Sequence, residues 1–435
     1  MPRTPDEPSV ERDSLPATGQ AYYALAAVVV VLAFSLVDRN ILSILLVDIK
    51  GEFNASDKEM GFLTGMAFAI TNAIAGIPLA RLADRGSRRT LIAAGLAAWS
   101  VLTAAQGFAR SIGMLALARV GVGIGEASTG PAAHSMISDY FGPERRATAI
   151  AIYTMGGHLG VLIGLVAGGW LNDVVGWRMT LVAVGLPGLL FALLFVFTVR
   201  EPVRGQSENR TAEATVPLLE VVRYLWSRPS FRHLCAAAPL LVSAFYCVNI
   251  WGPAFLIRVH GLTTSEVGIR LGPIMGIGGA FGTLLGGYLC DRLGALDSRN
   301  YLRVPGVAAI AMLPFLVLFL LAAEVNTALL ALAPMVVLAA TFIAPIYSVS
   351  LGLARLRMRA MSSAMVHLIT SIVGAGVAPQ IIGILNDALS VRFGDEAVRY
   401  SLFLLVLTNA WGAAHILWAA RSLRADMANA AAEAP

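Results

Sequence analysis

Residues 21–47 read AYYALAAVVVVLAFSLVDRNILSILLV. This run exceeds the roughly 20 apolar residues that a helix needs to cross a bilayer. Two ionisable residues, Asp38 and Arg39, interrupt it near its middle. The run therefore predicts a membrane-spanning helix that carries an acid and a base inside the membrane.

Similar apolar runs recur along most of the 435 residues. The chain is 57% hydrophobic and 14% charged, whereas about a quarter of a soluble protein is charged. The predicted spans are near residues 21–47, 58–80, 88–108, 112–139, 146–170, 177–198, 231–257, 267–290, 302–323, 327–350, 358–386 and 398–420. This pattern predicts an all-α integral membrane protein with twelve transmembrane helices.

A polar interval divides these spans six and six. We expect a cytoplasmic tail, a first six-helix bundle, a cytoplasmic linker, a second bundle and a second tail, at residues 1–20, 21–198, 199–230, 231–421 and 422–435. The linker segment 217–226 alternates apolar and charged residues and could form a short helix on the membrane surface. The acidic residues of the first tail are unlike a cleavable signal peptide, so the first span is expected to act as an uncleaved anchor.

Two short segments occur once in each half. Residues 82–86 (LADRG) match 289–293 (LCDRL) at an offset of 207, and residues 169–173 (GWLND) match 383–387 (GILND) at an offset of 214. The halves are thus parallel repeats around a central cavity. In transporters built this way the solute site lies at the repeat interface near the membrane midplane.

The basic residues orient the chain, because Lys and Arg concentrate on the cytoplasmic side of membrane proteins. With a cytoplasmic N-terminus, 22 of the 32 Lys and Arg fall on that side, 8 fall opposite and two, Arg39 and Arg119, lie in spans. Both termini are therefore predicted to be cytoplasmic. The Arg-rich, Ala-rich composition suggests a bacterial genome, and hence a multi-pass protein of the inner membrane.

Several function classes lack any signal. The net charge of +5 reflects topology, so no nucleic-acid partner is expected. The three cysteines show no metal-ligand spacing, and no phosphate-binding loop or nucleophile–base arrangement is apparent. We expect no enzyme activity, no cofactor and no metal, with the bilayer as the main surrounding and the chain acting as a monomer.

The loops after the second and eighth spans carry a recognisable pattern. Asp84, Arg85 and Arg88 stand in the first loop, and Asp291 and Arg292 in the second. These loops resemble the signature Gly-x-x-x-Asp-Arg-x-Gly-Arg-Arg of the major facilitator superfamily, although the first lacks the leading glycine and the second lacks the trailing arginines. The carboxylates and guanidinium groups are predicted to form a conformational latch that favours one bundle arrangement.

Glycines on the fourth and fifth spans extend this resemblance. Residues 119–125 (RVGVGIG) look like the superfamily's Arg-x-x-x-Gly-x-Gly motif, and such glycines allow close helix packing. The fifth span resembles the antiporter glycine motif, but Leu165 stands where a proline is usual, so small-residue packing is the favoured interpretation. Residues 34–39 and 123–127 are similar to spinster-type transporters, a resemblance that implies a sphingolipid- or lysophospholipid-like substrate.

Four ionisable residues lie deep in the predicted spans: Asp38, Arg39, Arg119 and Glu126. Such residues are costly in a membrane and usually face a cavity. Arg119 and Glu126 are seven residues apart, hence on one helix face. We predict one compact cluster, with Asp38 as the main proton carrier, Glu126 as a second carrier and Arg119 as the switching counter-ion, because a nearby arginine favours an ionised carboxylate.

The same cluster offers contacts for a substrate. Arg39 could bind a phosphate or carboxylate or face another helix, and a permanent structural ion network is the competing interpretation. The candidate substrate-binding residues are Arg39, Arg119, Glu126, His134, Tyr246, Asn249, Trp251 and Tyr347. His134 is either a proton relay or an interhelical hydrogen-bond partner.

The function indicated is secondary active transport by alternating access. We expect proton coupling and a small amphipathic, lipid-like solute of the sphingoid or lysophospholipid type. A multidrug–proton antiporter and an organic-anion–proton symporter remain alternatives. A non-transporting membrane sensor is an alternative of another class, although it would need no buried acid–base cluster.

Overall fold

The computed structural model describes residues 18–203 and 217–432, and it contains helices and connecting turns but no strand in that part of the chain. Most of the predicted first tail (1–20) and part of the linker (199–230) lie outside the described residues. The helical content agrees with the all-α fold that the apolar runs predict.

The first half contains eight α-helices and one π-helical turn. They are α1 (Thr18–Ile44), α2 (Leu46–Phe53), α3 (Asp57–Gly61), η1 (Phe62–Met66), α4 (Ala67–Arg85), α5 (Arg88–Gln106), α6 (Ile112–Glu126), α7 (Thr129–Tyr140) and α8 (Pro143–Thr198). A short linker helix, α9 (Leu218–Trp226), follows where the amphipathic pattern predicts one.

The second half is built from the remaining elements. They are α10 (Pro229–His260), α11 (Thr264–Pro273), η2 (Ile274–Gly278), α12 (Gly279–Gly294), α13 (Asn300–Leu321), α14 (Val325–Ala340), α15 (Ile343–Gly352), η3 (Leu356–Met358), α16 (Arg359–Ile369), η4 (Thr370–Val377), α17 (Ala378–Phe393), η5 (Gly394–Glu396), α18 (Ala397–Leu402) and α19 (Leu404–Ala432). The π-helical turns η1, η2 and η4 lie inside continuous helical segments.

Eight helical segments of the described chain are long and apolar enough to cross a membrane. Two of them, Glu144–Thr198 and Met361–Ala430, have 55 and 70 residues, about twice what one crossing needs. Gly176 (φ 76°) and Gly394 (φ 55°) divide these two in left-handed conformations that glycine adopts easily. Counting each as two crossings and adding α5 and the α6–α7 pair gives the twelve predicted crossings.

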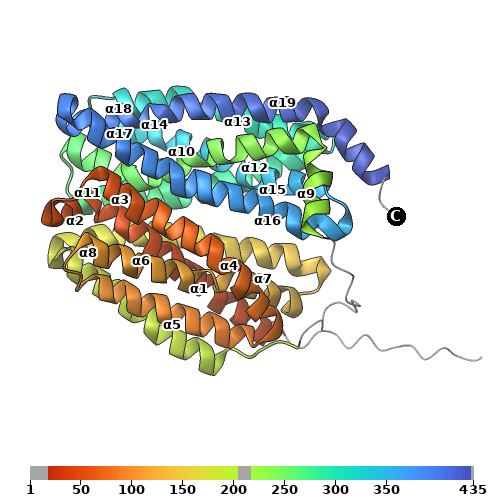
Figure 1. The fold of residues 1–435 in the computed structure, drawn as a ribbon, viewed down its shortest axis with the longest axis horizontal. Coiled ribbons are helices and arrows are strands. Elements are labelled where there is room, and N and C mark those ends of the chain that lie inside the picture. The colour runs from red at the N-terminus through yellow and green to blue at the C-terminus, as the bar shows by residue number, and fades with distance from the viewer. Residues whose placement is uncertain (1–17, 204–216, 433–435) are drawn as a thin grey trace, which may run out of the picture.

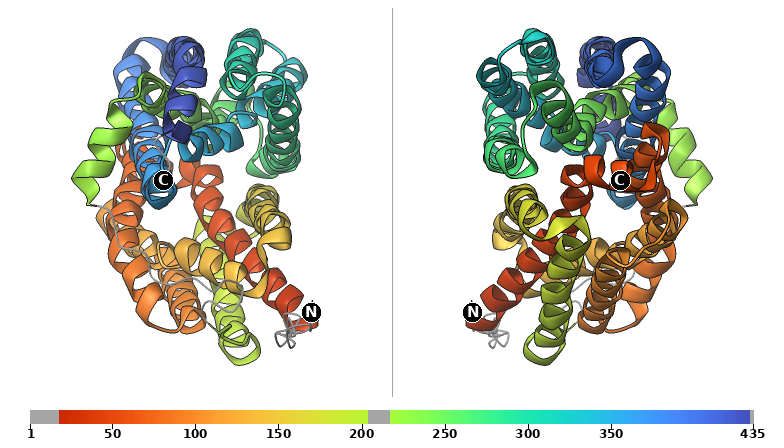
Figure 2. Two further views of the ribbon diagram at one scale, coloured as in Figure 1. Left: turned by 90° about the vertical axis from the view of Figure 1, so that its right-hand side faces the viewer. Right: turned by 90° about the vertical axis from the view of Figure 1, so that its left-hand side faces the viewer.

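Two bundles are separate in space and correspond to the two halves of the chain. Figure 1 shows the red-to-yellow first half below the green-to-blue second half. Helices α2, α3 and α11 lie at one end, whereas the C-terminus and α9 lie at the other. We call these the outer and inner ends, following the charge-based topology prediction, and Figure 2 views the molecule from each.

Small residues bring α1 against α8 in the first half. A Cβ atom at Gly160 would lie 2.4 Å from the carbonyl oxygen of Ala33, and one at Gly156 would lie 2.6 Å from that of Val29. Larger residues would force the two helices apart, so the glycine face on the fifth span is a packing surface, as expected. This close contact fixes α1, the helix that carries Asp38.

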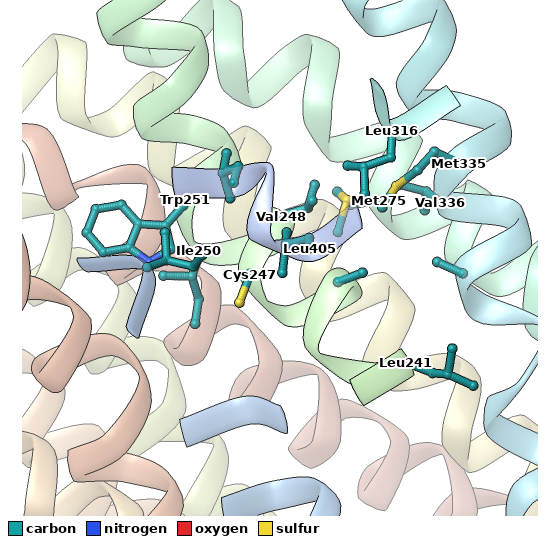
Figure 3. Close-up of a cluster of buried hydrophobic side chains, with 14 of the residues drawn as sticks. Leu241, Cys247, Val248, Ile250, Trp251, Met275, Leu316, Met335, Val336 and Leu405 are labelled. Carbon is teal, nitrogen blue, oxygen red and sulfur yellow. The ribbon is translucent and has the colours of Figure 1, made fainter. Parts of the chain in front are cut away.

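The second half has a dense apolar core. Trp251, Cys247, Met275, Leu316 and Met335 are all buried members of this core, which Figure 3 shows. All three cysteines of the chain are buried and unpaired, in keeping with a packing role.

Candidate functional site

The four deep charges come together between α1 and α6 as two ion pairs. Arg119 Nη1 lies 2.6 Å from Asp38 Oδ2. Arg39 Nε donates to Glu126 Oε2 at 2.8 Å, and Arg39 Nη2 lies 2.7 Å from the same oxygen. The predicted cluster therefore exists, with Arg39 rather than Arg119 as the direct partner of Glu126.

Uncharged groups complete the cluster. Ser35 Oγ donates to Glu126 Oε2 at 2.6 Å, and the Thr103 hydroxyl donates to Asp38 Oδ1. The ring of Phe68 lies under both guanidinium groups, 4.4 Å from Arg39 Cζ and 4.9 Å from Arg119 Cζ. Cation–π contacts of this kind stabilise a charge that has left water.

The members of the cluster differ in exposure. Asp38, Arg119 and Glu126 are buried, whereas the side chain of Arg39 is 31% exposed. Two buried atoms, Glu126 Oε1 and Arg119 Nε, have no hydrogen-bond partner among the described residues. Arg39 is therefore the group through which a solute could reach the cluster, and Glu126 retains the capacity to accept a further proton or hydrogen bond.

Local sequence explains the position of Glu126. Gly123 and Gly125 let α6 approach α4 and α5, since a Cβ atom at Gly123 would lie 3.1 Å from Phe68 O. The helix then ends at Glu126, and Ser128 Oγ donates to the carbonyl oxygen of Gly125. The fourth span, predicted as one helix over 112–139, is thus broken beside its functional carboxylate.

Across from the cluster, the second half presents hydroxyl groups and an imidazole. A cavity of about 80 Å³ is lined by Val242, Tyr246, Ile343, Ile346, Tyr347, His367, Thr370 and Ser371. His367 Nδ1 is 3.2 Å from the Tyr347 hydroxyl and its Nε2 is 3.4 Å from Ser371 Oγ. Arg39 is close enough to Tyr246 and His367 to interact with both electrostatically.

The candidate substrate contacts divide into two groups. Tyr246 and Tyr347 line this cavity. Asn249 and Trp251 do not: both are buried, and the indole of Trp251 donates to the carbonyl oxygen of Pro379 at 3.0 Å. In this conformation the Trp251 ring packs α10 against α17, and its contact with a solute stays a prediction.

His134 lies on α7, on the inner side of the cluster. Its ring meets that of Tyr153 edge to face, with centroids 5.3 Å apart, and Tyr153 interacts electrostatically with Arg39. His134 itself is exposed. These contacts leave both the relay and the structural interpretation of His134 as predictions.

The predicted latch residues occupy unequal surroundings. Arg88 is buried and forms ion pairs with Asp139 and Glu201, and Arg88 Nε lies 2.8 Å from Glu201 Oε1. Arg88 also donates to the carbonyl oxygen of Pro202. Arg88 therefore joins the start of α5 to the end of α7 and to residues 201–202. Burial raises the pKa of Glu201, but hydrogen bonds from Arg89, Arg88 and Ser87 outweigh it and hold that pKa below its usual value.

The other latch residues are exposed. Asp84 and Arg85 end α4, and Arg292 donates to the hydroxyl of Tyr288 at 3.1 Å beside Asp291. The role of these residues as a latch stays a prediction. The described residues contain no group of three His, Cys, Asp or Glu that could hold a metal ion.

Sequence reasoning missed several residues of the site. Ser35 and Thr103 are short hydroxyl residues of a kind common throughout membrane helices, so nothing in their own positions set them apart. His367 was not among the candidate residues. Its contact with Tyr347 joins positions 20 residues apart on two helices, and only the fold brings these together.

Two bundles of six crossings with paired charges at their interface define a membrane solute transporter. The model of the Major Facilitator Superfamily matches residues 28–379. The chain belongs to this superfamily, and its relatives make it a transporter of the spinster type.

These relatives cover nearly the whole chain. An MFS-type efflux pump of Mycolicibacterium smegmatis is 33% identical over 89% of both chains. Protein spinster homolog 1 of Homo sapiens is 26% identical over 98% of this chain and 85% of that protein. A crystal structure of a bacterial homologue of the human lysosomal transporter Spinster, inward-facing and unoccupied, has a TM-score of 0.84 at 28% identity, covering 94% of this chain and 99% of that one.

Proposed function

We propose that this protein is a proton-coupled secondary transporter of an amphipathic, lipid-like anion, working by alternating access. The proposal places it as a monomer in the inner membrane of a bacterium, with both termini in the cytoplasm. The observation that carries it is the two ion pairs of the first half, of which one arginine, Arg39, is partly exposed and interacts electrostatically with Tyr246 of the opposite half.

The pairing supports a cycle of proton and substrate exchange. Glu126 is held by Arg39 and Ser35 but keeps one oxygen without a partner. When an anionic group of the substrate draws Arg39 away, Glu126 loses its counter-charge and takes up a proton. Release of the substrate returns Arg39 to Glu126, and the proton leaves.

Asp38 would act one step deeper. Asp38 is paired with Arg119 and accepts a hydrogen bond from Thr103. Both Arg119 and Arg39 contact the ring of Phe68, so a displacement of one arginine affects the position of the other. A protonated Asp38 would free Arg119, and the altered charge would favour one of the two bundle arrangements. In this scheme Asp38 and Glu126 together carry the transported proton.

The cavity wall of the second half favours an anion. Its polar lining consists of hydroxyl groups and a histidine, with no carboxylate. Arg39 has donors left beyond those that it gives to Glu126. A phosphate or carboxylate head would therefore find donors on both walls, and the apolar residues Val242, Ile343 and Ile346 would receive part of a hydrocarbon chain.

The relatives support the same class. Spinster-type proteins match over nearly the full chain. The similarity to a protein named an efflux pump keeps a multidrug–proton antiporter as a second candidate. A cationic drug would need Glu126 itself as its partner, since the facing wall offers no acid. An organic-anion–proton symporter for a less amphipathic solute would use the same donors.

Proteoliposomes with the purified protein test the proposal. Labelled lysophospholipids should move faster under an imposed pH gradient than without one, and unlabelled anionic lysolipid should compete while fluorescent cations compete poorly. Strong competition by cations together with weak competition by lysolipid would favour the drug antiporter. Equal rates with and without the gradient would refute proton coupling.

A further inference from the structure

The repeated segments 169–173 and 383–387 lie at the outer end, where the two halves meet. They end the fifth crossing and the eleventh crossing, and each carries an aspartate in its last position, Asp173 and Asp387. Neither residue belongs to the charge cluster or to the cavity. Their contacts are with the other half of the molecule.

Asp387 receives hydrogen bonds from the first turn of the second crossing. Its two carboxylate oxygens accept from the backbone N–H groups of Asp57 and Lys58, each at 2.8 Å. Asp173 does the same for the eighth crossing: it accepts from the backbone N–H of Ser265 at 2.9 Å and from the hydroxyl of Thr264. Each half thus caps one helix of the other.

The capped helices also have their own matched capping boxes. Ser56 and Glu59 form one box before α3, and Thr263 and Glu266 form the other before α11, at the repeat offset of 207. A capping box satisfies the N–H groups of the N-cap and N3 positions. The N1 and N2 positions remain, and these are the positions that the cross-half aspartates contact.

Close backbone contact accompanies each cap. A Cβ atom at Gly383 would lie 2.3 Å from the carbonyl oxygen of Asp57, and one at Gly169 would lie 2.3 Å from that of Thr264. The seams are therefore tight in this conformation, and the four positions obey the same two offsets as the repeats. Figure 1 shows α3 and α17 together at this end.

The two seams are not identical. Arg258 of the second half donates to Asp57 at 2.6 and 2.9 Å, while Lys50 of the first half lies 2.7 Å from the same carboxylate. Asp57 therefore keeps a cation from its own half when the halves separate. At the other seam, Asn172 bonds Asp48 and Thr264 instead.

We propose that Asp173 and Asp387 are two symmetric locks of the outer gate, which hold the outer end closed by capping the N1–N2 groups of helices in the opposite half. When the gate opens, each helix keeps the hydrogen bonds of its own capping box, and only the N1 and N2 groups that the aspartate had bound become hydrogen-bonded to water. The pair of locks sets the equilibrium between the closed and open outer end. This inference depends on alternating access, but on neither the proposed substrate nor proton coupling.

Distances between spin labels at two exposed residues of the outer end test it: Arg110, in the loop before α6, and Asn326, in the first turn of α14 in the opposite half. Asp387→Ala and Asp173→Ala should each raise the ratio of long-distance to short-distance populations about tenfold, because each loses hydrogen bonds to a charged acceptor. Asp387→Asn, which retains one acceptor oxygen, should give a smaller shift. The control Asp395→Ala, an exposed acid after α17, should give none.

A steric variant covers the case in which an alanine variant folds poorly. Gly383→Ala should open the same end, whereas Gly287→Ala, at a site with nothing within 4 Å, should not. Unchanged distance distributions in both aspartate variants and in Gly383→Ala would overturn the proposal. So would equal shifts in the controls.

Discussion

The two halves share a repeated backbone but divide the chemistry of the site between them. The first half contributes two buried ion pairs, with one arginine within reach of a solute. The second half contributes tyrosines, a histidine and apolar side chains, with no carboxylate on its cavity wall. This difference indicates that the shared fold forms the cavity, while a few side chains in each half determine which half carries the ionisable groups.

The outer end teaches the opposite lesson. There the halves remain alike, since each contributes a glycine, a capping box and an aspartate at corresponding positions. A gate must be held from both sides of the interface, so symmetry is useful there. At the centre, a proton and a substrate need different surroundings, and symmetry is lost.

The largest expected effect follows from breaking the deeper ion pair of the first half. Arg119→Gln leaves Asp38 buried without its counter-ion, a change that costs about 3–5 kcal/mol. We expect the apparent Tm in detergent to fall by roughly 10 °C. Adding Asp38→Asn to the same chain should restore much of the loss.

The exposed residue Arg110 provides the control for that experiment. Arg110→Gln should leave the apparent Tm unchanged. If Arg119→Gln were as stable as the parent protein, or if the double variant gained nothing, the two residues would not act as a pair.

The next effect concerns the exposed arginine of the first half. Arg39→Gln removes charged donors, so the KM for an anionic lysolipid should rise roughly tenfold or more. Arg39→Lys should fall between this variant and the parent, because lysine keeps the charge but loses the planar fork. A KM that changes equally for an uncharged analogue would contradict recognition of the anionic head.

A smaller effect is expected on the facing wall. Tyr347→Phe removes one neutral hydrogen bond with His367, so the KM should rise by about threefold. The ratio of protons to substrate should stay the same, since this wall carries no carboxylate. An altered ratio in Tyr347→Phe would break the division of labour between the halves.

The smallest effect lies at the inner end of the first half. Hydrogen bonds hold the pKa of Glu201 below its usual 4.5, so its contribution to stability is present above that pH and is lost as the pH falls through the lower folded value. The apparent Tm of Glu201→Gln should be about 2 °C below the parent at pH 7. The gap should shrink as the pH falls below 4.5 and further through the lowered folded pKa, and a gap that widens on acidification would contradict this sign.

Much of this architecture could be predicted from the sequence because a bilayer leaves few options. Apolar length fixes the crossings, and Asp38 or Glu126 is conspicuous because ionised groups are rare in a membrane. The ion-pair partners of these carboxylates were harder to predict. Seven-residue spacing placed Arg119 and Glu126 on one face, but the fold pairs Glu126 with Arg39 of another helix.

Contacts between distant segments account for the remaining gaps. Asp387 was recognised as part of a repeat, yet its partners lie about 330 residues away, and local spacing says nothing about them. Trp251 looked available beside Asn249, but packing against Pro379 buries it. Which face of an apolar helix meets a neighbour is decided by shape across the whole bundle.

The central claim is that the first half carries the proton and the second half does not. Proteoliposomes that contain a pH-sensitive dye measure proton movement when an anionic lysolipid is added, and exchange of labelled for unlabelled lysolipid measures transport without a proton gradient. Asp38→Asn and Glu126→Gln should lose the proton signal yet retain exchange, whereas Tyr347→Phe should retain both. Proton movement at the parental rate in both carboxylate variants would contradict the account.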